Sequence, residues 1–207
     1  MKQNYKAYLK YLLFFYVLCI SKIAFSYENI LILGDSLSAG YGIGIESSWT
    51  KLLDKKLKKE RFLFNVINRS ISGETTAGGI RRLPKLLSIT KPKIVILELG
   101  ANDGLRGLDL NQTKNNLSQM VNLIKKIGAK TLLIGIRIPP NYGQRYSKKF
   151  YNQFEEIASE KKIVLLPFMF KGFGKKKEYF LEDQIHPNKA AQKKILINVW
   201  DKLKTML

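Results

Sequence analysis

Five short apolar runs recur along the chain, and they restrict its fold more than any other feature of the sequence. The runs lie at residues 30–33, 62–67, 94–99, 131–138 and 163–166. Each run is continuous rather than alternating, as is typical of parallel strands buried on both faces. Helix-like segments separate and follow the runs, at residues 49–59, 77–87, 111–127, 148–161 and 189–206. Because strand and helix alternate throughout, the sequence predicts an α/β fold built from right-handed βαβ units around one doubly wound parallel sheet.

The N-terminal residues have the features of an export signal. Three lysines precede an apolar stretch at residues 11–20, and the Ala-Phe-Ser at 24–26 suits cleavage before Tyr27. The apolar stretch is about half of the roughly 20 residues needed to span a bilayer. We therefore expect a cleaved signal at residues 1–26 and one domain at residues 27–207, with a retained N-terminal anchor as the alternative. The expected destination is the periplasm, with secretion into the medium as a second possibility.

Cysteine and histidine are scarce, and this excludes several kinds of chemistry. The only cysteine, Cys19, falls inside the expected signal, so residues 27–207 contain none. Neither a disulfide framework nor a cysteine nucleophile is available to the mature chain. One histidine without any thiolate also argues against a zinc site. We expect an ordinary packed core and no metal.

Basic residues dominate the charge. Lys and Arg total 36 against 16 Asp and Glu, a formal net charge of +20, which falls by four to +16 without the lysines of residues 1–26. Few of the basic residues are arginine, the residue favoured for reading phosphates, and the lysines are spread along the helix-like segments. We interpret them as solvated helix faces rather than as a nucleic-acid interface. A transient contact with an anionic membrane surface stays open.

Polar clusters follow the apolar runs at the points where the strands are expected to end. They lie at residues 34–38, 68–76 and 100–104, and a fourth cluster at 183–186 follows the last run. In an open parallel sheet the working residues lie beyond the carboxyl ends of the strands. The sequence therefore predicts that all four clusters meet on one rim of the domain.

Two of these clusters contain the parts of a serine hydrolase. Ser36 directly follows the first run, and the only histidine, His186, lies three residues after Asp183. A serine hydroxyl becomes a useful nucleophile when a neighbouring base takes its proton, and an imidazole oriented by a carboxylate supplies that base. Taken singly, Ser36 and Asp183 are equally typical helix N-caps. Together on one rim, they favour a Ser36–His186–Asp183 catalytic triad.

Acyl transfer also requires hydrogen-bond donors for the developing oxyanion. The candidates are the Ser36 and Gly73 backbone N–H groups and the side-chain amide of Asn102. A turn glycine and a turn-forming asparagine are alternative interpretations of the last two residues.

The four clusters resemble the sequence blocks of the SGNH (GDSL-type) hydrolase superfamily. Gly34-Asp35-Ser36-Leu37 resembles the first block, Gly73 the second, Gly100-Ala101-Asn102-Asp103 the third and Asp183-Gln184-Ile185-His186 the fifth. The longer matches around these blocks, and Pro140-Asn141-Tyr142-Gly143, are similar to a group of bacterial periplasmic multifunctional acyl-CoA thioesterase/lysophospholipase/arylesterases. This resemblance implies a flavodoxin-like three-layer α/β/α sandwich with a five-stranded parallel sheet. It assigns the same catalytic and oxyanion roles and implies no cofactor.

The resemblance also implies a substrate-responsive loop at residues 104–109, beside an acyl groove. The residues expected to bind the substrate are Gly104, Leu105, Arg106, Leu108, Ile138 and Tyr142. For Arg106 and Arg137, contact with a substrate anion and ordinary salt bridging both stay open. Glu98, in a buried run, is interpreted as a structural carboxylate.

The function expected from these features is hydrolysis of acyl esters, and of acyl thioesters and lysophospholipids, by a monomeric exported serine esterase acting on small-molecule substrates. A carbohydrate acetylesterase acting on envelope polysaccharide is the alternative within enzymes. Outside enzymes, the alternative is a basic module that binds polyanions. Acyl-chain length and headgroup preference depend on loop geometry and do not follow from the sequence.

Overall fold

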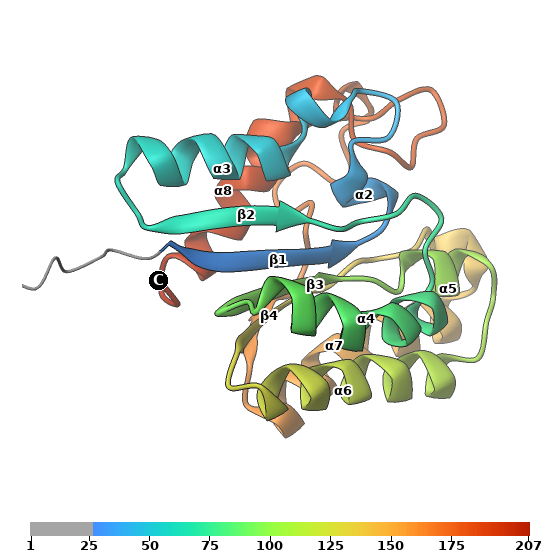
Figure 1. The fold of residues 1–207 in the computed structure, drawn as a ribbon. Helices are drawn as coiled ribbons and strands as arrows, with labels where there is room; N and C mark the ends of the chain where they lie inside the picture. The colour runs from blue at the N-terminus through green and yellow to red at the C-terminus, as the bar shows by residue number, and fades with distance from the viewer. Residues whose placement is uncertain (1–26) are drawn as a thin grey trace, which may run out of the picture.

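The computed structural model describes residues 27–207, with the side chain of Pro140 excepted, so the expected signal at 1–26 lies outside the described residues. Five strands form one parallel sheet with the order β2-β1-β3-β4-β5 (Figure 1). The strands are β1 (Glu28–Gly34), β2 (Phe64–Asn68), β3 (Ile94–Glu98), β4 (Lys130–Ile134) and β5 (Val164–Leu166). The predicted parallel α/β sheet is confirmed.

Helices cover both faces of this sheet. One layer contains α3 (Trp49–Lys59) and α8 (Gln192–Leu203), which pack against each other. The other contains α4 (Thr76–Thr90), α6 (Leu110–Lys126) and α7 (Gln144–Lys161), as Figure 1 shows. The central strands β1, β3 and β4 are almost entirely buried between the layers, which explains their uninterrupted apolar sequences.

Short helices complete the loops. The two short α-helices, α2 (Ser36–Ala39) and α5 (Ala101–Leu105), follow β1 and β3 directly. The 3₁₀ turns are η1 (Ile45–Ser47), η2 (Pro140–Tyr142), η3 (Lys177–Tyr179) and η4 (Lys189–Ala191). Among the helices of residues 27–207, none has the length and apolar character to cross a bilayer.

The fourth strand is shorter than the sequence predicts. It ends at Ile134, whereas the apolar run continues to Ile138. At Gly135 the chain passes so close to the segment after β5 that an added Cβ would lie 2.3 Å from the Pro167 carbonyl oxygen. The Gly135 N–H donates to the Leu166 carbonyl (2.8 Å), and the Gly135 carbonyl accepts from the Met169 N–H (3.0 Å). These bonds turn the remaining apolar residues out of the sheet.

The sheet order fixes where a site can form. From β1, the chain moves outward to β2 and then crosses back to β3, so the direction of winding reverses between β1 and β3. In open α/β sheets, ligands bind in the crevice at such a reversal, beyond the carboxyl ends of the strands. Ser36 is the first residue of α2, which follows β1, and Asn102 is the second residue of α5, which follows β3.

Candidate active site

Ser36 is placed by a tight turn at the end of β1. Asp35 caps α2, and its side chain accepts a hydrogen bond from the Leu37 N–H (3.0 Å). Gly34 leaves no room for a side chain, because an added Cβ would lie 2.7 Å from Glu98 Oε2 and 3.0 Å from Ser38. The chain therefore turns without steric conflict and presents Ser36 at the wall of a cavity.

His186 lies beside Ser36 although 150 residues separate them in the sequence. The two side chains are 2.9 Å apart, from His186 Nε2 to Ser36 Oγ. On the other side of the ring, His186 Nδ1 lies 2.7 Å from Asp183 Oδ2. A hydrogen on Nδ1 directed at the carboxylate leaves the Nε2 lone pair facing the serine hydroxyl, which is the arrangement that general-base catalysis requires.

The Asp183 carboxylate is oriented by its own turn. Its Oδ1 atom accepts from the backbone N–H groups of Ile185 and His186, both at 2.9 Å. Burial by itself raises the pKa of Asp183, but these two N–H groups and the His186 ring together hold it below its ordinary value. The carboxylate is therefore ionised at neutral pH, and only Oδ2 is left to face the ring.

The histidine turn is anchored to the rest of the domain. The His186 carbonyl accepts from the Leu181 N–H (2.8 Å). Gln192, at the start of α8, donates to the Pro187 carbonyl (3.2 Å) and accepts from the Trp49 N–H (2.9 Å). The Tyr41 ring lies against the imidazole, with the ring centroids 4.3 Å apart. Contacts from two distant segments thus hold the ring in one orientation.

The candidate oxyanion donors come from the loops after β1, β2 and β3. The loop after β2 runs beside the end of β1, because the Ile71 N–H donates to the Gly34 carbonyl (3.0 Å). Gly73 follows with φ +79°, a conformation that favours glycine. Among the described residues, no acceptor is found for the N–H groups of Ser36 and Gly73.

The Asn102 amide is held by two acceptors. Its Nδ2 donates to Asp35 Oδ2 (3.1 Å) and to the Glu74 carbonyl (3.0 Å). Both amide hydrogens are therefore engaged in this structure. For Asn102 to serve an oxyanion, one of these bonds must be exchanged or shared.

Two carboxyl groups lie buried directly beneath Ser36. Burial raises the pKa of Asp35 to about 7. Burial, and then the charge of Asp35, raise the pKa of Glu98 well above its usual range. Glu98 Oε2 accepts from the Ser38 hydroxyl (2.7 Å) and the Asp35 N–H (3.3 Å), whereas Oε1 has no partner among the described residues. Glu98 thus contacts the turn that carries Ser36, and its buried surroundings disfavour the charged form of its carboxyl group.

A cavity of about 430 Å³ opens beside Ser36 and His186. Its walls come mainly from the loops after β3, β4 and β5, and most of the side chains are apolar. The apolar and aromatic members are Leu37, Ala101, Leu105, Ile136, Ile138, Pro139, Phe168, Phe170, Phe180 and Ile185. Arg137 and Lys175 also line it. Such a wall fits an apolar chain attached to a reacting carbonyl.

Two of the residues expected to bind the substrate, Leu105 and Ile138, lie in this wall. The other four lie outside it. Gly104 packs under Phe150, and an added Cβ there would lie 2.7 Å from that ring. Arg106 donates to the Gly73 carbonyl (3.0 Å), and the Tyr142 hydroxyl donates to the Leu105 carbonyl (2.9 Å).

The fourth, Leu108, is exposed, and its carbonyl accepts from the Tyr146 hydroxyl (3.2 Å). These contacts brace the loop rather than line the cavity.

Arg137 was expected either to meet a substrate anion or to form a salt bridge. It forms no salt bridge among the described residues, and its guanidinium group lies over the rings of Tyr151 (4.3 Å) and Phe168 (4.8 Å).

The main part of the wall that sequence reasoning missed is aromatic. Phe168, Phe170 and Phe180 lie in the long segment between β5 and the histidine turn. The density of phenylalanine in a segment without helix or strand periodicity is the one signal that could have indicated them.

Comparison with known proteins gives the class of enzyme. A family model described as the GDSL-like lipase/acylhydrolase family matches residues 32–194, a span that contains Ser36, Asp183 and His186. The chain belongs to this family. It is an ester hydrolase with the SGNH hydrolase fold.

Individual relatives cover most of the chain. The esterase TesA of Pseudomonas aeruginosa is 44% identical over 180 residues, covering 87% of this chain and 90% of the relative. The crystal structure of TesA superposes with a TM-score of 0.85 and covers 87% of this chain and 100% of that chain. Thioesterase 1/protease 1/lysophospholipase L1 of Escherichia coli is 40% identical over 179 residues, covering 86% and 85% of the two chains.

A third comparison is with an inhibited enzyme. The psychrotrophic esterase EstA of Pseudoalteromonas sp., in a structure inhibited by monoethylphosphonate, is 43% identical with a TM-score of 0.82. The alignment covers 86% of this chain and 97% of that chain.

Proposed function

We propose that the protein is an exported serine esterase that hydrolyses fatty acyl esters, acyl thioesters and lysophospholipids, with Ser36 as nucleophile, His186 as base and Asp183 as the residue that orients the base. The observation that carries the proposal is the continuous hydrogen-bond chain from Ser36 Oγ through the His186 ring to Asp183, at the mouth of an apolar cavity.

In the proposed reaction, Ser36 Oγ attacks the acyl carbonyl carbon while His186 Nε2 takes the hydroxyl proton. Asp183 stabilises the imidazolium that forms. The oxyanion accepts hydrogen bonds from the Ser36 and Gly73 N–H groups and from Asn102. Collapse of the intermediate expels the alcohol or thiol, which receives the proton from His186. Water then attacks the acyl-enzyme, again with His186 as base, and releases the fatty acid and free Ser36.

The size and chemistry of the cavity favour a long acyl chain over an acetyl group. An acetyl group would leave most of the roughly 430 Å³ unfilled, and the wall of apolar side chains matches the methylene groups of a longer chain. The E. coli relative, named both as a thioesterase and as a lysophospholipase, supports more than one kind of leaving group. A carbohydrate acetylesterase is the weaker alternative.

The test combines a covalent probe with a panel of substrates. We expect a fluorophosphonate to label wild-type protein at Ser36 and to leave Ser36→Ala unlabelled. We also expect octanoyl and longer p-nitrophenyl esters, a long-chain acyl-CoA and a lysophosphatidylcholine to be hydrolysed with higher kcat/KM than p-nitrophenyl acetate. Labelling of another side chain contradicts the nucleophile, and activity on acetyl esters alone contradicts the acyl specificity.

The same variant separates catalysis from polyanion binding. Ser36→Ala retains every lysine, so it keeps any affinity for polyanions while losing hydrolysis. Salt-sensitive binding to DNA, by a wild type that hydrolyses none of the esters above, favours the basic binding module instead.

The proposal of export concerns residues 1–26, which lie outside the described residues. It is supported by the basic and apolar pattern of the sequence alone. Expression of the full chain in a bacterium, followed by N-terminal sequencing of the soluble envelope fraction, is expected to give Tyr27 as the first residue. An intact N-terminus in the membrane fraction indicates the retained anchor.

A further inference from the structure

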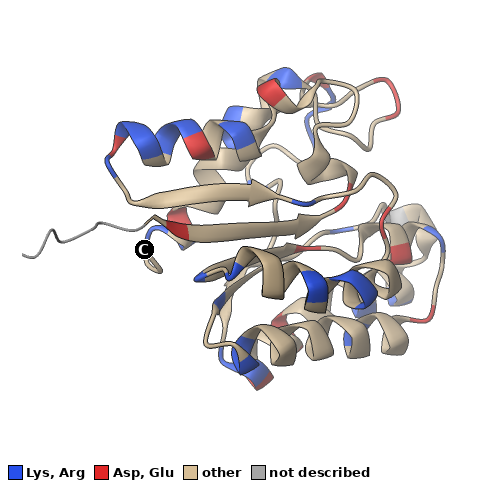
Figure 2. Ribbon diagram, in the orientation of Figure 1, with Lys and Arg blue, Asp and Glu red and all other residues tan. Residues whose placement is uncertain are grey.

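The side of the domain at which the strands begin, opposite the candidate active site, is strongly basic. The helices α3, α4, α6 and α7 each return the chain to the start of the next strand, so their last turns lie at the edge where the strands begin (Figure 1). Cations are favoured at helix C-termini, because they complement the helix dipole. Figure 2 shows the resulting basic residues at the ends of α3 and α6 on this side. We call it the basal edge.

Several of these cations are free of carboxylate partners. Among residues 27–207, no salt bridge is found for Lys59, Arg61, Lys91, Lys126 or Lys162, all of which are exposed. Their charges are therefore available to an anionic partner. These five positive charges are not balanced by carboxylates in contact with them within residues 27–207.

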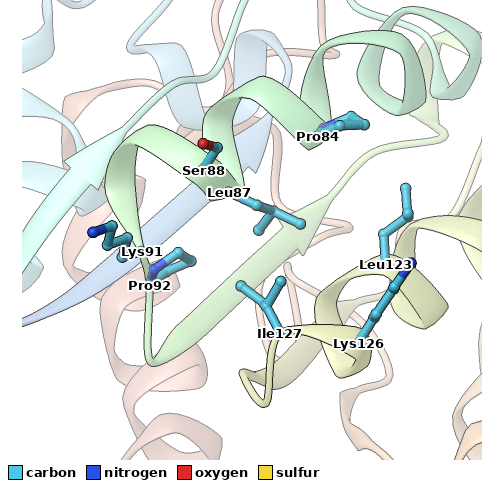
Figure 3. A pocket seen from close by; sticks show the side chains of 8 residues that line it. All are labelled: Pro84, Leu87, Ser88, Lys91, Pro92, Leu123, Lys126 and Ile127. Atoms are coloured by element: carbon cyan, nitrogen blue, oxygen red, sulfur yellow. The ribbon is translucent and has the colours of Figure 1, made fainter.

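An apolar groove opens at the basal edge between the ends of α4 and α6. Its volume is about 460 Å³, and it is lined by Leu87, Pro92, Leu123 and Ile127 together with Lys91 and Lys126. In Figure 3, the Leu87 and Ile127 side chains point toward each other across this groove.

One apolar side chain of the groove is also exposed to solvent, since Ile127 is 47% exposed. An apolar groove lined partly by two unpaired ammonium groups is complementary to an amphiphile with an anionic head.

We propose that the basal edge docks on an anionic phospholipid surface, with the groove receiving part of a lipid acyl chain and Lys91 and Lys126 contacting the headgroup phosphate. The catalytic cavity, at the opposite edge, then faces the aqueous side and takes monomeric substrate from it. This docking is independent of the proposed catalytic roles, since none of the groove residues belongs to the candidate active site.

The first experiment tests the orientation. Residues 27–207 contain the whole sheet, both helix layers and the core, and they contain no cysteine. Ser88→Cys, in the groove, and Lys177→Cys, near the candidate active site, therefore each accept one environment-sensitive fluorophore. With phosphatidylglycerol vesicles, we expect the emission of the label at 88 to shift to the blue and that at 177 to stay unchanged. The opposite pattern overturns the proposal.

A control without lipid tests the other possible occupant of the groove. A blue shift at 88 that depends on protein concentration and needs no vesicles would assign the groove to a second copy of the chain, and that result also overturns the proposal.

The second experiment tests the cations with variants matched in charge. Lys91→Glu with Lys126→Glu changes the groove, whereas Lys176→Glu with Lys177→Glu makes the same change in net charge at the opposite edge. We expect the groove pair to weaken sedimentation with phosphatidylglycerol vesicles by about tenfold or more. The control pair is expected to bind phosphatidylglycerol vesicles within about twofold of wild type. Vesicles of phosphatidylcholine alone are expected to bind neither the wild type nor the two variants. Equal weakening by both pairs, or no binding by wild type, overturns the proposal.

Discussion

Replacement of Asp183 by asparagine isolates the contribution of the histidine tautomer. Because Asp183 Oδ1 accepts two backbone N–H groups, the amide oxygen of the introduced asparagine takes that position and its NH₂ group takes the place of Oδ2, 2.7 Å from His186 Nδ1. An NH₂ group donates, so Nδ1 must become the acceptor and the hydrogen moves to Nε2. The ring then has no lone pair to receive the proton of Ser36.

We expect the loss in kcat to be about 10⁴-fold, the magnitude associated with a wrong histidine tautomer in a serine triad. That factor corresponds to about 5 kcal/mol of transition-state stabilisation. The free energy of unfolding should change by less than about 1 kcal/mol, since the asparagine keeps the acceptor for both N–H groups. The measurements are kcat and KM with p-nitrophenyl octanoate at neutral pH and urea unfolding of both proteins.

Two controls separate the tautomer from other effects. Glu182→Gln makes the same charge change at the neighbouring residue, for which no hydrogen bond or ion pair with the ring is found among the described residues, and it should leave kcat unchanged. Asp183→Ala removes the bias toward the wrong tautomer but also the acceptor for two N–H groups. It should therefore retain at least as much kcat as Asp183→Asn and lose about 0.5–2 kcal/mol of stability. A kcat for Asp183→Asn within about tenfold of wild type would refute the proposed role of this hydrogen bond.

Three further outcomes follow from the site and the core. Asn102→Ala should lower kcat by about 10²–10³-fold with little change in KM, measured in the same assay; a change in KM alone contradicts the oxyanion role. Gly104→Ala places a Cβ 2.7 Å from Phe150 and 2.9 Å from Ile138, so thermal unfolding should show a loss of about 1–3 kcal/mol, and an unchanged Tm contradicts this packing. Because burial raises the pKa of Asp35 from 3.8 to about 7, the folded state retains a proton that the unfolded chain releases, and this group lowers stability as the pH rises through that interval. Urea unfolding at about pH 5 and pH 8 should therefore show a larger loss for wild type than for Asp35→Asn, and equal losses contradict the buried position of this carboxyl group.

The strands and the rim could be predicted because their signals are local. A strand buried on both faces requires a continuous apolar run, so the composition of a few neighbouring residues reveals it. In a parallel sheet, the carboxyl ends of the strands share one edge whatever their order, and this is why Ser36, Asn102 and His186 were expected on the same rim. The catalytic roles of these residues remain a proposal, although the hydrogen bonds between Ser36, His186 and Asp183 are those that the proposal requires.

The amino-acid sequence by itself determined the class of fold, the polar clusters at the carboxyl ends of the strands and the pairing of one serine with the only histidine. The tertiary structure decided where β4 ends, which aromatic side chains line the cavity, how Asp35 holds Asn102, and the groove between α4 and α6. Each of these depends on a contact between segments far apart in the chain, such as Gly135 with Pro167. No periodicity within one segment encodes such a contact, because the partner that limits the space or accepts the hydrogen bond lies in another segment.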